Sequence, residues 1–189
     1  MLANRVKQLY SAGKTAFGTY VVIPSPMVIE VAGQAGLDFV RIDNYHNRWN
    51  PETLANMVRS CYDQDITPWI RCRNDPWVIM TALDMGAQAI SISNIGTVER
   101  AQQAVASTFY PPKGERLWGP FHAPFRWNVS MADYMASADD DMICIVTIEH
   151  IEAVNRIDEI MATPGIDLAV IAPGDLATSI NKRGLPDDP

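Results

Sequence analysis

Met142-Ile-Cys-Ile-Val-Thr-Ile148 and Ile166-Asp-Leu-Ala-Val-Ile-Ala172 are two short apolar runs that are rich in β-branched residues. Continuous runs of this length are typical of strands that are buried on both faces of a sheet. A helix-like segment joins them, and a crossover helix returns the chain to the same edge of a sheet. The two runs are therefore predicted to be neighbouring parallel strands.

A carboxylate follows each of these predicted strands. Glu149 directly follows the first run, and Asp175 comes after the second within Pro173-Gly174-Asp175. Because the carboxyl ends of parallel strands meet at one rim, the two side chains are expected to converge there. Two such carboxylates favour a hard divalent cation that keeps several waters, such as Mg²⁺ or Mn²⁺, with Thr147 beneath it on the strand face of Glu149. The alternative for Asp175 is a structural role as a helix N-cap.

Four further strands are predicted upstream, at residues 16–23, 37–42, 67–71 and 87–93. Helices separate them, and three helices open on a capping residue followed by proline, at Ser25-Pro26, Asn50-Pro51 and Asp75-Pro76. This alternation predicts an α/β fold with a parallel sheet. The preferred architecture is a TIM-type (β/α) barrel with about six of its eight units present and the C-terminal part absent. The alternative is an open doubly wound parallel sheet, and periodicity does not decide between the two.

Composition restricts the classes of function. The 189 residues suffice for one domain, 1–189, with a sizeable core. The net charge is −7 and no Lys/Arg cluster interrupts it, which argues against nucleic acid or a membrane surface as a partner. The three cysteines, Cys61, Cys72 and Cys144, lack metal-ligand spacing and are expected to be reduced, buried thiols. With no secretory or membrane-spanning segment recognised, a soluble cytoplasmic protein is expected.

Residues 108–130 interrupt the alternation of strands and helices. The stretch is rich in proline and aromatic residues and shows neither a helical nor a strand period. A loop of this length inside a compact domain is either functional or disordered, and its aromatic residues disfavour disorder. We therefore expect a lid or a subunit contact here, followed by a short helix near residues 131–138.

Polar side chains also follow the second and third predicted strands. Asp43 and His46 come after the second strand, and Arg71 ends the third. In a parallel α/β fold these positions lie at the same rim as the two carboxylates described above. Each has a plainer interpretation: His46 as a solvated loop histidine, Asp43 as a turn cap, and Arg71 as a surface partner of Asp75.

Together these segments resemble the class II, metal-dependent pyruvate aldolases of the HpcH/HpaI type, including the 2-keto-3-deoxy sugar acid and 4-hydroxy-2-oxo-heptanedioate aldolases. The resemblance covers nearly the whole chain. It is carried, in order, by Leu37-Asp-Phe-Val-Arg-Ile-Asp-Asn-Tyr-His46, Ile70-Arg-Cys-Arg-Asn-Asp-Pro76, Asp84-Met-Gly-Ala-Gln88, Tyr110-Pro-Pro-Lys-Gly114, Thr147-Ile-Glu149 and Ile171-Ala-Pro-Gly-Asp-Leu-Ala177. It implies a (β/α) barrel and a homo-oligomer, either a hexamer or a dimer of barrels that exchange C-terminal helices.

The resemblance also implies roles for individual residues. Glu149 and Asp175 look like the two protein ligands of a divalent ion, expected to be Mg²⁺ or Mn²⁺, with Co²⁺ as a further candidate. His46, oriented by Asp43, resembles the acid/base histidine of the family. Arg71 resembles the arginine that contacts the pyruvyl oxygen.

Three further positions are expected to bind substrate. The backbone at Pro173-Gly174-Asp175, which opens a helix, would hold the pyruvate carboxylate through its N–H groups. Thr147 stands where the family usually has glutamine, so its part in binding the 2-oxo acid differs from the usual pattern.

The implied function is that of a lyase, the metal-dependent retro-aldol cleavage of a small-molecule 4-hydroxy-2-oxo acid to pyruvate and an aldehyde. One alternative is an acyl-CoA lyase of the citrate-lyase type, with the aromatic loop 109–127 packing a larger ligand. Another is a non-catalytic or impaired paralogue that binds a small acid, because Asn44-Tyr45 replaces the family's Gly-Glu and the last two barrel units are absent. The aldehyde partner, the preferred metal and the stereochemistry do not follow from the sequence.

Overall fold

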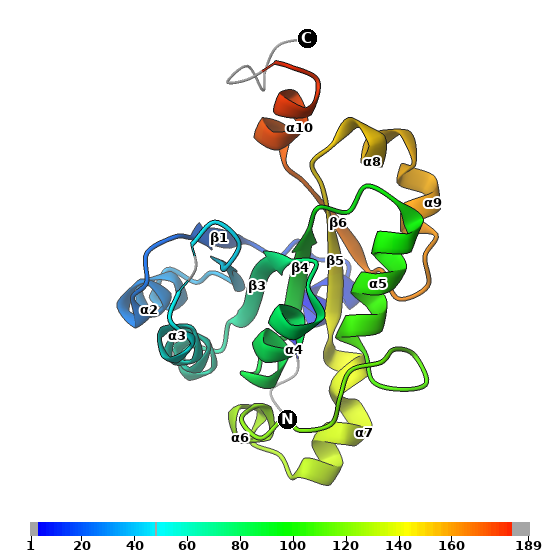
Figure 1. Cartoon of the computed structure of the whole chain (residues 1–189). Helices are drawn as coiled ribbons and strands as arrows, with labels where there is room; N and C mark the ends of the chain where they lie inside the picture. The colour runs from blue at the N-terminus through cyan, green and yellow to red at the C-terminus, as the bar shows by residue number, and fades with distance from the viewer. Residues whose placement is uncertain (1–3, 48, 183–189) are drawn as a thin grey trace.

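The chain folds around one six-stranded parallel sheet, seen in a computed structural model that describes residues 4–47 and 49–182 (Figure 1). Its strands are β1 (Gly18–Val21), β2 (Phe39–Asp43), β3 (Thr67–Arg73), β4 (Ala89–Ser93), β5 (Ile143–Ile148) and β6 (Leu168–Ile171). They follow one another in the sheet in the order β1-β2-β3-β4-β5-β6. Every predicted strand is therefore present, and the prediction that β5 and β6 are parallel neighbours is confirmed.

Helices alternate with the strands. They are α1 (Arg5–Ser11), α2 (Pro26–Gln34), α3 (Pro51–Asp63), α4 (Pro76–Asp84), α5 (Val98–Thr108), α6 (Ala123–Trp127), α7 (Met131–Asp141), α8 (Ile151–Asn155), α9 (Ile157–Met161) and α10 (Pro173–Ser179). The predicted proline starts are confirmed for α2, α3 and α4. Asn50 and Asp75 accept hydrogen bonds from first-turn amides, whereas the Ser25 side chain makes no capping bond. None of the helices in the described part of the chain is long and apolar enough to cross a membrane.

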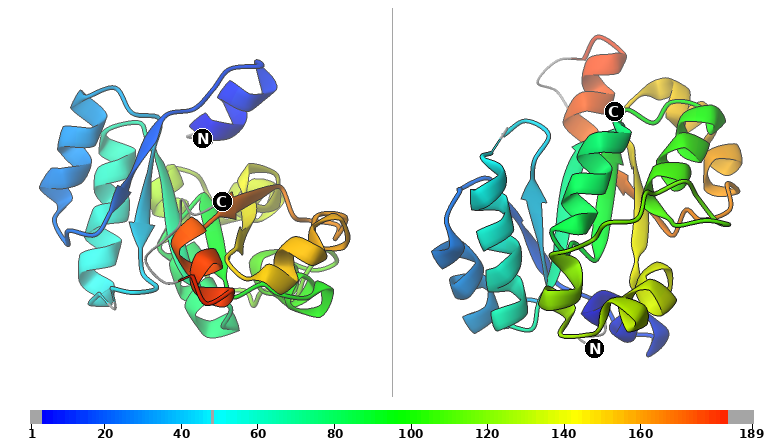
Figure 2. Two further views of the ribbon diagram at one scale, coloured as in Figure 1. Left: turned by 90° about the horizontal axis from the view of Figure 1, so that it is seen from above. Right: turned by 60° about the horizontal axis from the view of Figure 1, so that its bottom comes forward.

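The two faces of the sheet have different chemistry. One face carries residues such as Val40, Ile70, Ile92 and Val146, which form the main apolar core with the helices. The other face is the inside of the curl, visible from above in Figure 2. Towards the amino ends of the strands this inner face is apolar, with Trp69 and Ile145 in a second cluster that includes Val6 of α1. Towards the carboxyl ends of the strands the inner face carries polar residues such as Arg71, Ser93 and Thr147, and the candidate site lies there.

The sheet is open along its β1 and β6 edges, which agrees with the open sheet of the alternative prediction but not with its doubly wound strand order, and closure into a barrel is not seen among the described residues. Its strand order contains no reversal, so successive crossovers run in one direction around a half-barrel. The prediction that the last strand is buried on both faces is wrong for β6, whose residues alternate between half-buried and exposed. An edge strand of an open sheet lacks the neighbour that would cover it.

The 108–130 segment lies at the amino end of the sheet, where Figure 1 shows α6 and α7 far from α10. Arg116 anchors it there, with Nη2 2.6 Å from Oδ1 of Asp84 and 3.2 Å from the hydroxyl oxygen of Tyr134. Asp84 is the last residue of α4, which precedes the start of β4. The segment is therefore not a lid over the carboxyl rim of its own sheet. The subunit contact stays a prediction.

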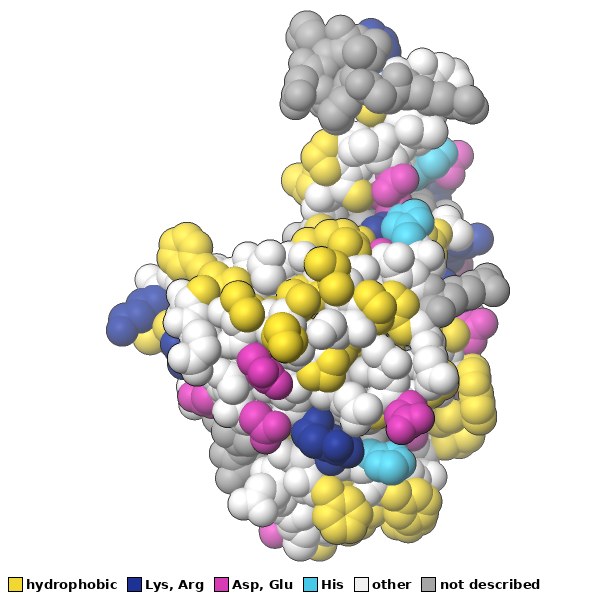
Figure 3. Space-filling model, turned by 90° about the vertical axis from the view of Figure 1, so that its left-hand side faces the viewer, with side chains coloured by type: hydrophobic (Ala, Val, Ile, Leu, Met, Phe, Trp, Pro, Cys, Tyr) yellow, Lys and Arg dark blue, Asp and Glu magenta, His cyan; other side chains and the backbone are white. Residues whose placement is uncertain are grey.

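Large apolar side chains remain exposed on the N-terminal part of the fold. They include Phe17, Met27 and Val31. Figure 3, which views the left-hand side of Figure 1, shows apolar side chains gathered across the middle of that face. Contiguous apolar surface of this kind is typical of contact surfaces, but the predicted homo-oligomer stays a prediction.

Candidate active site

The carboxyl rim of the sheet brings Arg71, Glu149 and Asp175 together. Arg71 lies on β3 two residues before its end, Glu149 directly follows β5, and Asp175 lies in the first turn of α10. One nitrogen of Arg71, Nη2, lies 3.2 Å from Oε2 of Glu149 and 3.9 Å from Oδ2 of Asp175. The two carboxylates that the sequence predicted to converge therefore meet at a single guanidinium. The interpretation of Arg71 as a surface partner of Asp75 is wrong, because Arg71 is buried.

Neighbouring strands hold the guanidinium of Arg71 in place. Its Nε donates to Oγ of Ser93 at 3.0 Å, and its Nη1 donates to the hydroxyl of Tyr20 at 3.3 Å. The guanidinium carbon also lies 4.9 Å from the centre of the Tyr45 ring. Burial opposes the charge of Arg71, but Tyr20 and Glu149 outweigh it and hold the pKa of Arg71 above its ordinary value. The guanidinium of Arg71 therefore stays positively charged.

The two carboxylates differ in how firmly they are held. Glu149 has an 11% exposed side chain, and its Oε1 accepts a hydrogen bond from the backbone N–H of Asn94. Asn94 presents that N–H from a left-handed conformation, φ 65°, which asparagine tolerates better than most residues. Asp175 has a 52% exposed side chain, and Ala172 rather than Asp175 is the N-cap of α10. One acid is thus fixed by the fold and the other faces solvent.

This donor set is compatible with a hard divalent cation. Two carboxylates of like charge converge, and hard cations of this kind take oxygen ligands. Within residues 4–47 and 49–182, no three His, Cys, Asp or Glu side chains gather closely enough to hold an ion by themselves. An ion between Glu149 and Asp175 would complete its coordination with water or substrate oxygens, as Mg²⁺ commonly does.

The predicted substrate positions lie beside this cluster. A Cβ built on Gly174 meets no atom within 4 Å, so the first turn of α10 borders open space. Thr147 is completely buried on the inner face of β5, and its Oγ1 has no hydrogen-bond partner in the described part of the chain. Their roles stay predictions.

Asp43 organises the loop that carries His46. Its Oδ1 accepts hydrogen bonds from the backbone amides of Tyr45, at 3.1 Å, and His46, at 3.4 Å, while its Oδ2 accepts from the side chain of Asn47 at 3.0 Å. Asp43 therefore orients the backbone at His46 rather than the imidazole. The imidazole is exposed and packs edge-on against the Tyr45 ring, 4.8 Å between ring centres.

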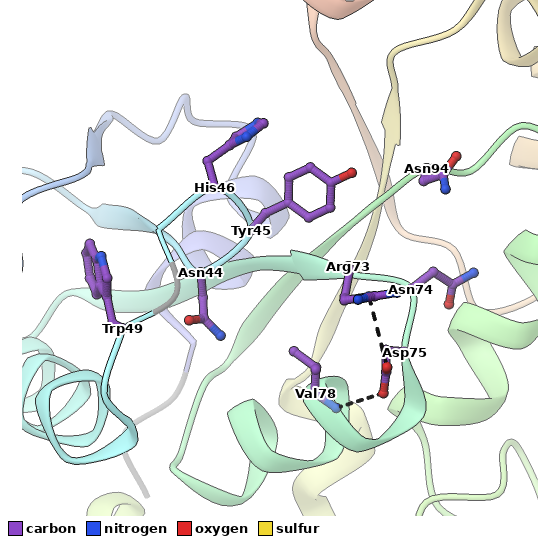
Figure 4. A pocket seen from close by; sticks show the side chains of 9 residues that line it. All are labelled: Asn44, Tyr45, His46, Trp49, Arg73, Asn74, Asp75, Val78 and Asn94. Atoms are coloured by element: carbon purple, nitrogen blue, oxygen red, sulfur yellow. Dashed lines mark hydrogen bonds and ion pairs between the residues drawn. The ribbon is translucent and has the colours of Figure 1, made fainter.

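A pocket of about 790 Å³ lies beside the cluster, between the β2–α3 and β3–α4 loops. Tyr45, which stacks on Arg71, and Asn94, whose N–H holds Glu149, both line it. Figure 4 shows the Tyr45 ring extending towards Asn94, while the Asn44 side chain points downward in the view, to the side where Val78 lies. The pocket therefore adjoins the Arg71–Glu149 pair through two of its own lining residues.

Sequence reasoning missed Tyr20, Ser93 and Asn94, which fix Arg71 and Glu149. Ser93 could have been found, because it ends a predicted strand and shares its inner face with Ser91. Tyr20 lies in an apolar run and carries no comparable signal. Asn94 acts through its backbone, so its side-chain type gives no indication of the contact.

A curled parallel sheet with a carboxylate–guanidinium cluster at its carboxyl rim is the architecture of an α/β enzyme. The family model described as HpcH/HpaI aldolase/citrate lyase matches residues 16–189. The chain belongs to this family. The curated relatives that it matches at 30–33% identity are named aldolases, which makes it a carbon–carbon lyase by class.

Individual relatives agree with that assignment. The chain is 31% identical over 187 residues to a hydroxypyruvate/pyruvate aldolase of Agrobacterium fabrum, covering 98% of this chain and 70% of the relative. It is 33% identical over 190 residues to a 4-hydroxy-2-oxo-heptane-1,7-dioate aldolase of Salmonella dublin, covering 100% of this chain and 72% of the relative. Among solved structures, an HpcH/HpaI aldolase from Desulfitobacterium hafniense superimposes with a TM-score of 0.90 at 27% identity, covering 99% of this chain and 73% of that chain.

Proposed function

We propose that the chain cleaves a 4-hydroxy-2-oxo acid by a divalent-metal-dependent retro-aldol reaction, releasing pyruvate and an aldehyde. The observation that carries this proposal is the convergence of Glu149 and Asp175 on Nη2 of Arg71. Relatives at about 31–33% identity that are named pyruvate or 4-hydroxy-2-oxo acid aldolases support the same reaction class.

Arg71 is the residue that would stabilise the charge formed in this reaction. When the bond between C3 and C4 breaks, negative charge develops on the keto oxygen as the enolate forms. A buried guanidinium fixed by Ser93 and Tyr20 needs little reorganisation to stabilise that charge. A divalent ion held by Glu149 and Asp175 would supply Lewis-acid polarisation of the same oxygen.

The substrate carboxylate would lie against the first turn of α10. The open space beside Gly174 leaves room for it, and the backbone N–H groups of Gly174 and Asp175 point out of the start of a helix. Together with Arg71 these groups would orient the pyruvyl part of the acid before cleavage.

Removal of the C4 hydroxyl proton requires a base at the rim, and His46 is the candidate. It is solvent-exposed on the loop that Asp43 holds, and it lines the 790 Å³ pocket that adjoins the acids. The imidazole would accept the proton through a water molecule or after a rotation of its side chain, because catalytic contacts often form only with substrate bound. Return of a proton to C3 of the enolate would then complete pyruvate. The aldehyde part of the substrate would then occupy this pocket.

Pyruvate release tests the proposal. The purified protein would be treated with a chelator and assayed on several 4-hydroxy-2-oxo acids before and after Mn²⁺ is restored. We expect release to stop on chelation and to return with Mn²⁺. Full activity in excess chelator would reject the metal role, and no pyruvate from any of these acids would reject the reaction.

An acyl-CoA lyase of the citrate-lyase type has less support. This alternative needs the aromatic loop 109–127 to pack a larger ligand at the site. These residues lie at the amino end of the sheet, opposite the carboxylates. Acyl-CoA cleavage measured in the same preparation separates this alternative from the aldolase.

A further inference from the structure

The hydroxyl of Tyr20 lies beside the guanidinium of Arg71 at the carboxyl rim. Nη1 of Arg71 donates to this hydroxyl at 3.3 Å, while Nη2 of the same guanidinium faces Glu149 at 3.2 Å. Tyr20 belongs to β1 and Arg71 to β3, so the contact reaches across β2. An oxygen that accepts this hydrogen bond still carries its own proton and can donate it. The guanidinium therefore lies between a hydroxyl and the acids that are proposed to hold the metal.

Tyr20 keeps its proton at ordinary pH and can recover it from solvent. Burial raises the pKa of the Tyr20 hydroxyl above its ordinary value, and the carboxylate of Asp43 adds to this effect, while Arg71 opposes it. The residue is 45% exposed, so water reaches its side chain. A neutral hydroxyl in such surroundings is suited to general acid catalysis, for which tyrosine is one of the side chains that enzymes use.

Cations are placed to stabilise Tyr20 once it has given up its proton. Arg71 contacts the hydroxyl oxygen directly. The guanidinium carbon of Arg41 lies 5.4 Å from the centre of the Tyr20 ring, and Nε of Arg41 donates to Oγ of Ser91 at 3.2 Å, which fixes the guanidinium there. Burial and Arg71 lower the pKa of Arg41, whereas negative charge on Tyr20 favours the charged form of Arg41. A phenolate at Tyr20 would thus be stabilised by cations that are already in place.

The retro-aldol reaction needs a proton donor close to Arg71. Cleavage between C3 and C4 leaves an enolate, which becomes pyruvate only when C3 receives a proton. Arg71 is the residue proposed to contact the keto oxygen on C2, and C3 is the next carbon of the substrate. Protonation of C3 removes the negative charge from the keto oxygen. A phenolate at Tyr20 would take over that charge beside the same guanidinium, so Arg71 keeps an anionic partner throughout the step.

We propose that Tyr20 is the catalytic acid that returns a proton to C3 of the pyruvate enolate. The inference rests on the proposed function, because it takes the enolate of that reaction as the proton acceptor. The O–H bond of Tyr20 breaks and a C3–H bond forms from the electron pair of the enolate, while the keto group is restored. The negative charge passes to the phenolate, which water protonates. The proton that His46 takes from the C4 hydroxyl returns to solvent, so the reaction consumes no net proton.

Deuterium exchange into the methyl group of pyruvate tests this role, because a group that protonates C3 also removes a C3 proton in the reverse direction. Mn²⁺-loaded protein is incubated with pyruvate in D₂O, and mass spectrometry of quenched samples measures the exchange rate. Tyr20→Phe removes the hydroxyl and keeps the ring beside Arg41. Tyr10→Phe removes the same hydroxyl from an exposed residue of α1 and is the matched control. Thermal melts show that each variant is folded.

Two further measurements separate proton donation from the positioning of Arg71. Calorimetry measures pyruvate binding to the Mn²⁺-loaded protein. The aldehyde formed in a single turnover of a 4-hydroxy-2-oxo acid reports bond breaking, which precedes protonation of C3. In Tyr20→Phe, Arg71 keeps its contacts with Ser93 and Glu149. Pyruvate binding and aldehyde formation should therefore depend little on the Tyr20 hydroxyl, whereas deuterium exchange should depend on it strongly.

We expect Tyr20→Phe to exchange deuterium on the order of 10²-fold to 10⁴-fold more slowly than the unmodified protein, which is the range for loss of a general acid–base group. Its pyruvate affinity and its single-turnover aldehyde formation should stay within about threefold of those of the unmodified protein. Tyr10→Phe should match the unmodified protein in all of these measurements.

An unchanged exchange rate in folded Tyr20→Phe overturns the inference. A parallel loss of exchange, pyruvate affinity and aldehyde formation also overturns it, because the hydroxyl would then only position Arg71. Unmodified protein that releases pyruvate from the acid but exchanges none of the methyl hydrogens contradicts it as well. Unmodified protein that neither cleaves any of the acids nor binds pyruvate would instead contradict the proposed function.

Discussion

Arg71 and Glu149 form an ion pair across the inner face of the sheet, with Nη2 of the arginine 3.2 Å from Oε2 of the glutamate. The two residues belong to β3 and to the end of β5, with β4 between them. Their side chains are only 7% and 11% exposed, so water screens the pair much less than it would at the surface. The pair places the guanidinium of Arg71 and the carboxylate of Glu149 close enough together for both to contact one small ligand.

Loss of the Arg71 guanidinium should remove most of the activity. In Arg71→Ala the keto oxygen loses its fixed cation, and turnover should fall on the order of 10²-fold to 10³-fold, as for the loss of an oxyanion donor. Arg71→Lys should recover only part of this loss, because an ammonium cannot contact Ser93, Tyr20 and Glu149 together. The measurement is kcat for pyruvate release, and a change in Arg71→Ala of less than about threefold would remove Arg71 from the chemistry.

Arg116 should matter for stability and not for the site. Its side chain is 1% exposed and pairs with Asp84 at 2.6 Å, at the end of the sheet opposite the acids. Arg116→Met leaves Asp84 without its partner, and because the Asp84 side chain is 23% exposed, leaving this acceptor unpaired should cost about 1–3 kcal/mol. Urea denaturation should report this loss, while the folded variant keeps its affinity for Mn²⁺. Unchanged stability would mean that the pair does not anchor the 108–130 segment.

The three thiols should remain protonated in the folded protein at ordinary pH. Burial raises the pKa of Cys144 to about 12, and it raises the pKa values of Cys61 and Cys72 as well. In the unfolded chain these thiols lose their protons at about pH 8.5, so the unfolded state releases protons that the folded state keeps. Stability from this source is complete below about pH 8.5 and falls as the pH rises towards 12.

Reaction with a thiol reagent at pH 8 checks this prediction. The native protein should react only as fast as it unfolds, whereas protein in denaturant should react at all three cysteines. Rapid labelling of any cysteine in the native protein would contradict their burial.

The sequence predicted the elements well because its signals are local. The pairs Asn50-Pro51 and Asp75-Pro76 mark helix starts that need no tertiary contact to be recognised, and both are confirmed. The apolar runs predicted all six strands for the same reason. The edge position of β6 was not predictable from its own residues, because its burial depends on which strand lies beside it.

The site was predictable only in part. Strand alternation placed Arg71, Glu149 and Asp175 at one rim, because carboxyl ends of parallel strands meet there. The supporting contacts of Tyr20 and Asn94 depend on how far the sheet curls and on a left-handed backbone position, and neither is encoded in a motif. The contact of Asp43 with the backbone of the His46 loop, and not with the imidazole, is likewise a matter of loop geometry.

Mn²⁺ binding and pyruvate release by Glu149→Gln and Asp175→Asn test the central claim most directly. Each change removes one negative oxygen ligand with little change in volume, so folded variants should lose Mn²⁺ binding and pyruvate release together. The unmodified protein, measured in parallel, should show both. Either variant retaining full pyruvate release, or binding Mn²⁺ as tightly as the unmodified protein, would contradict the account.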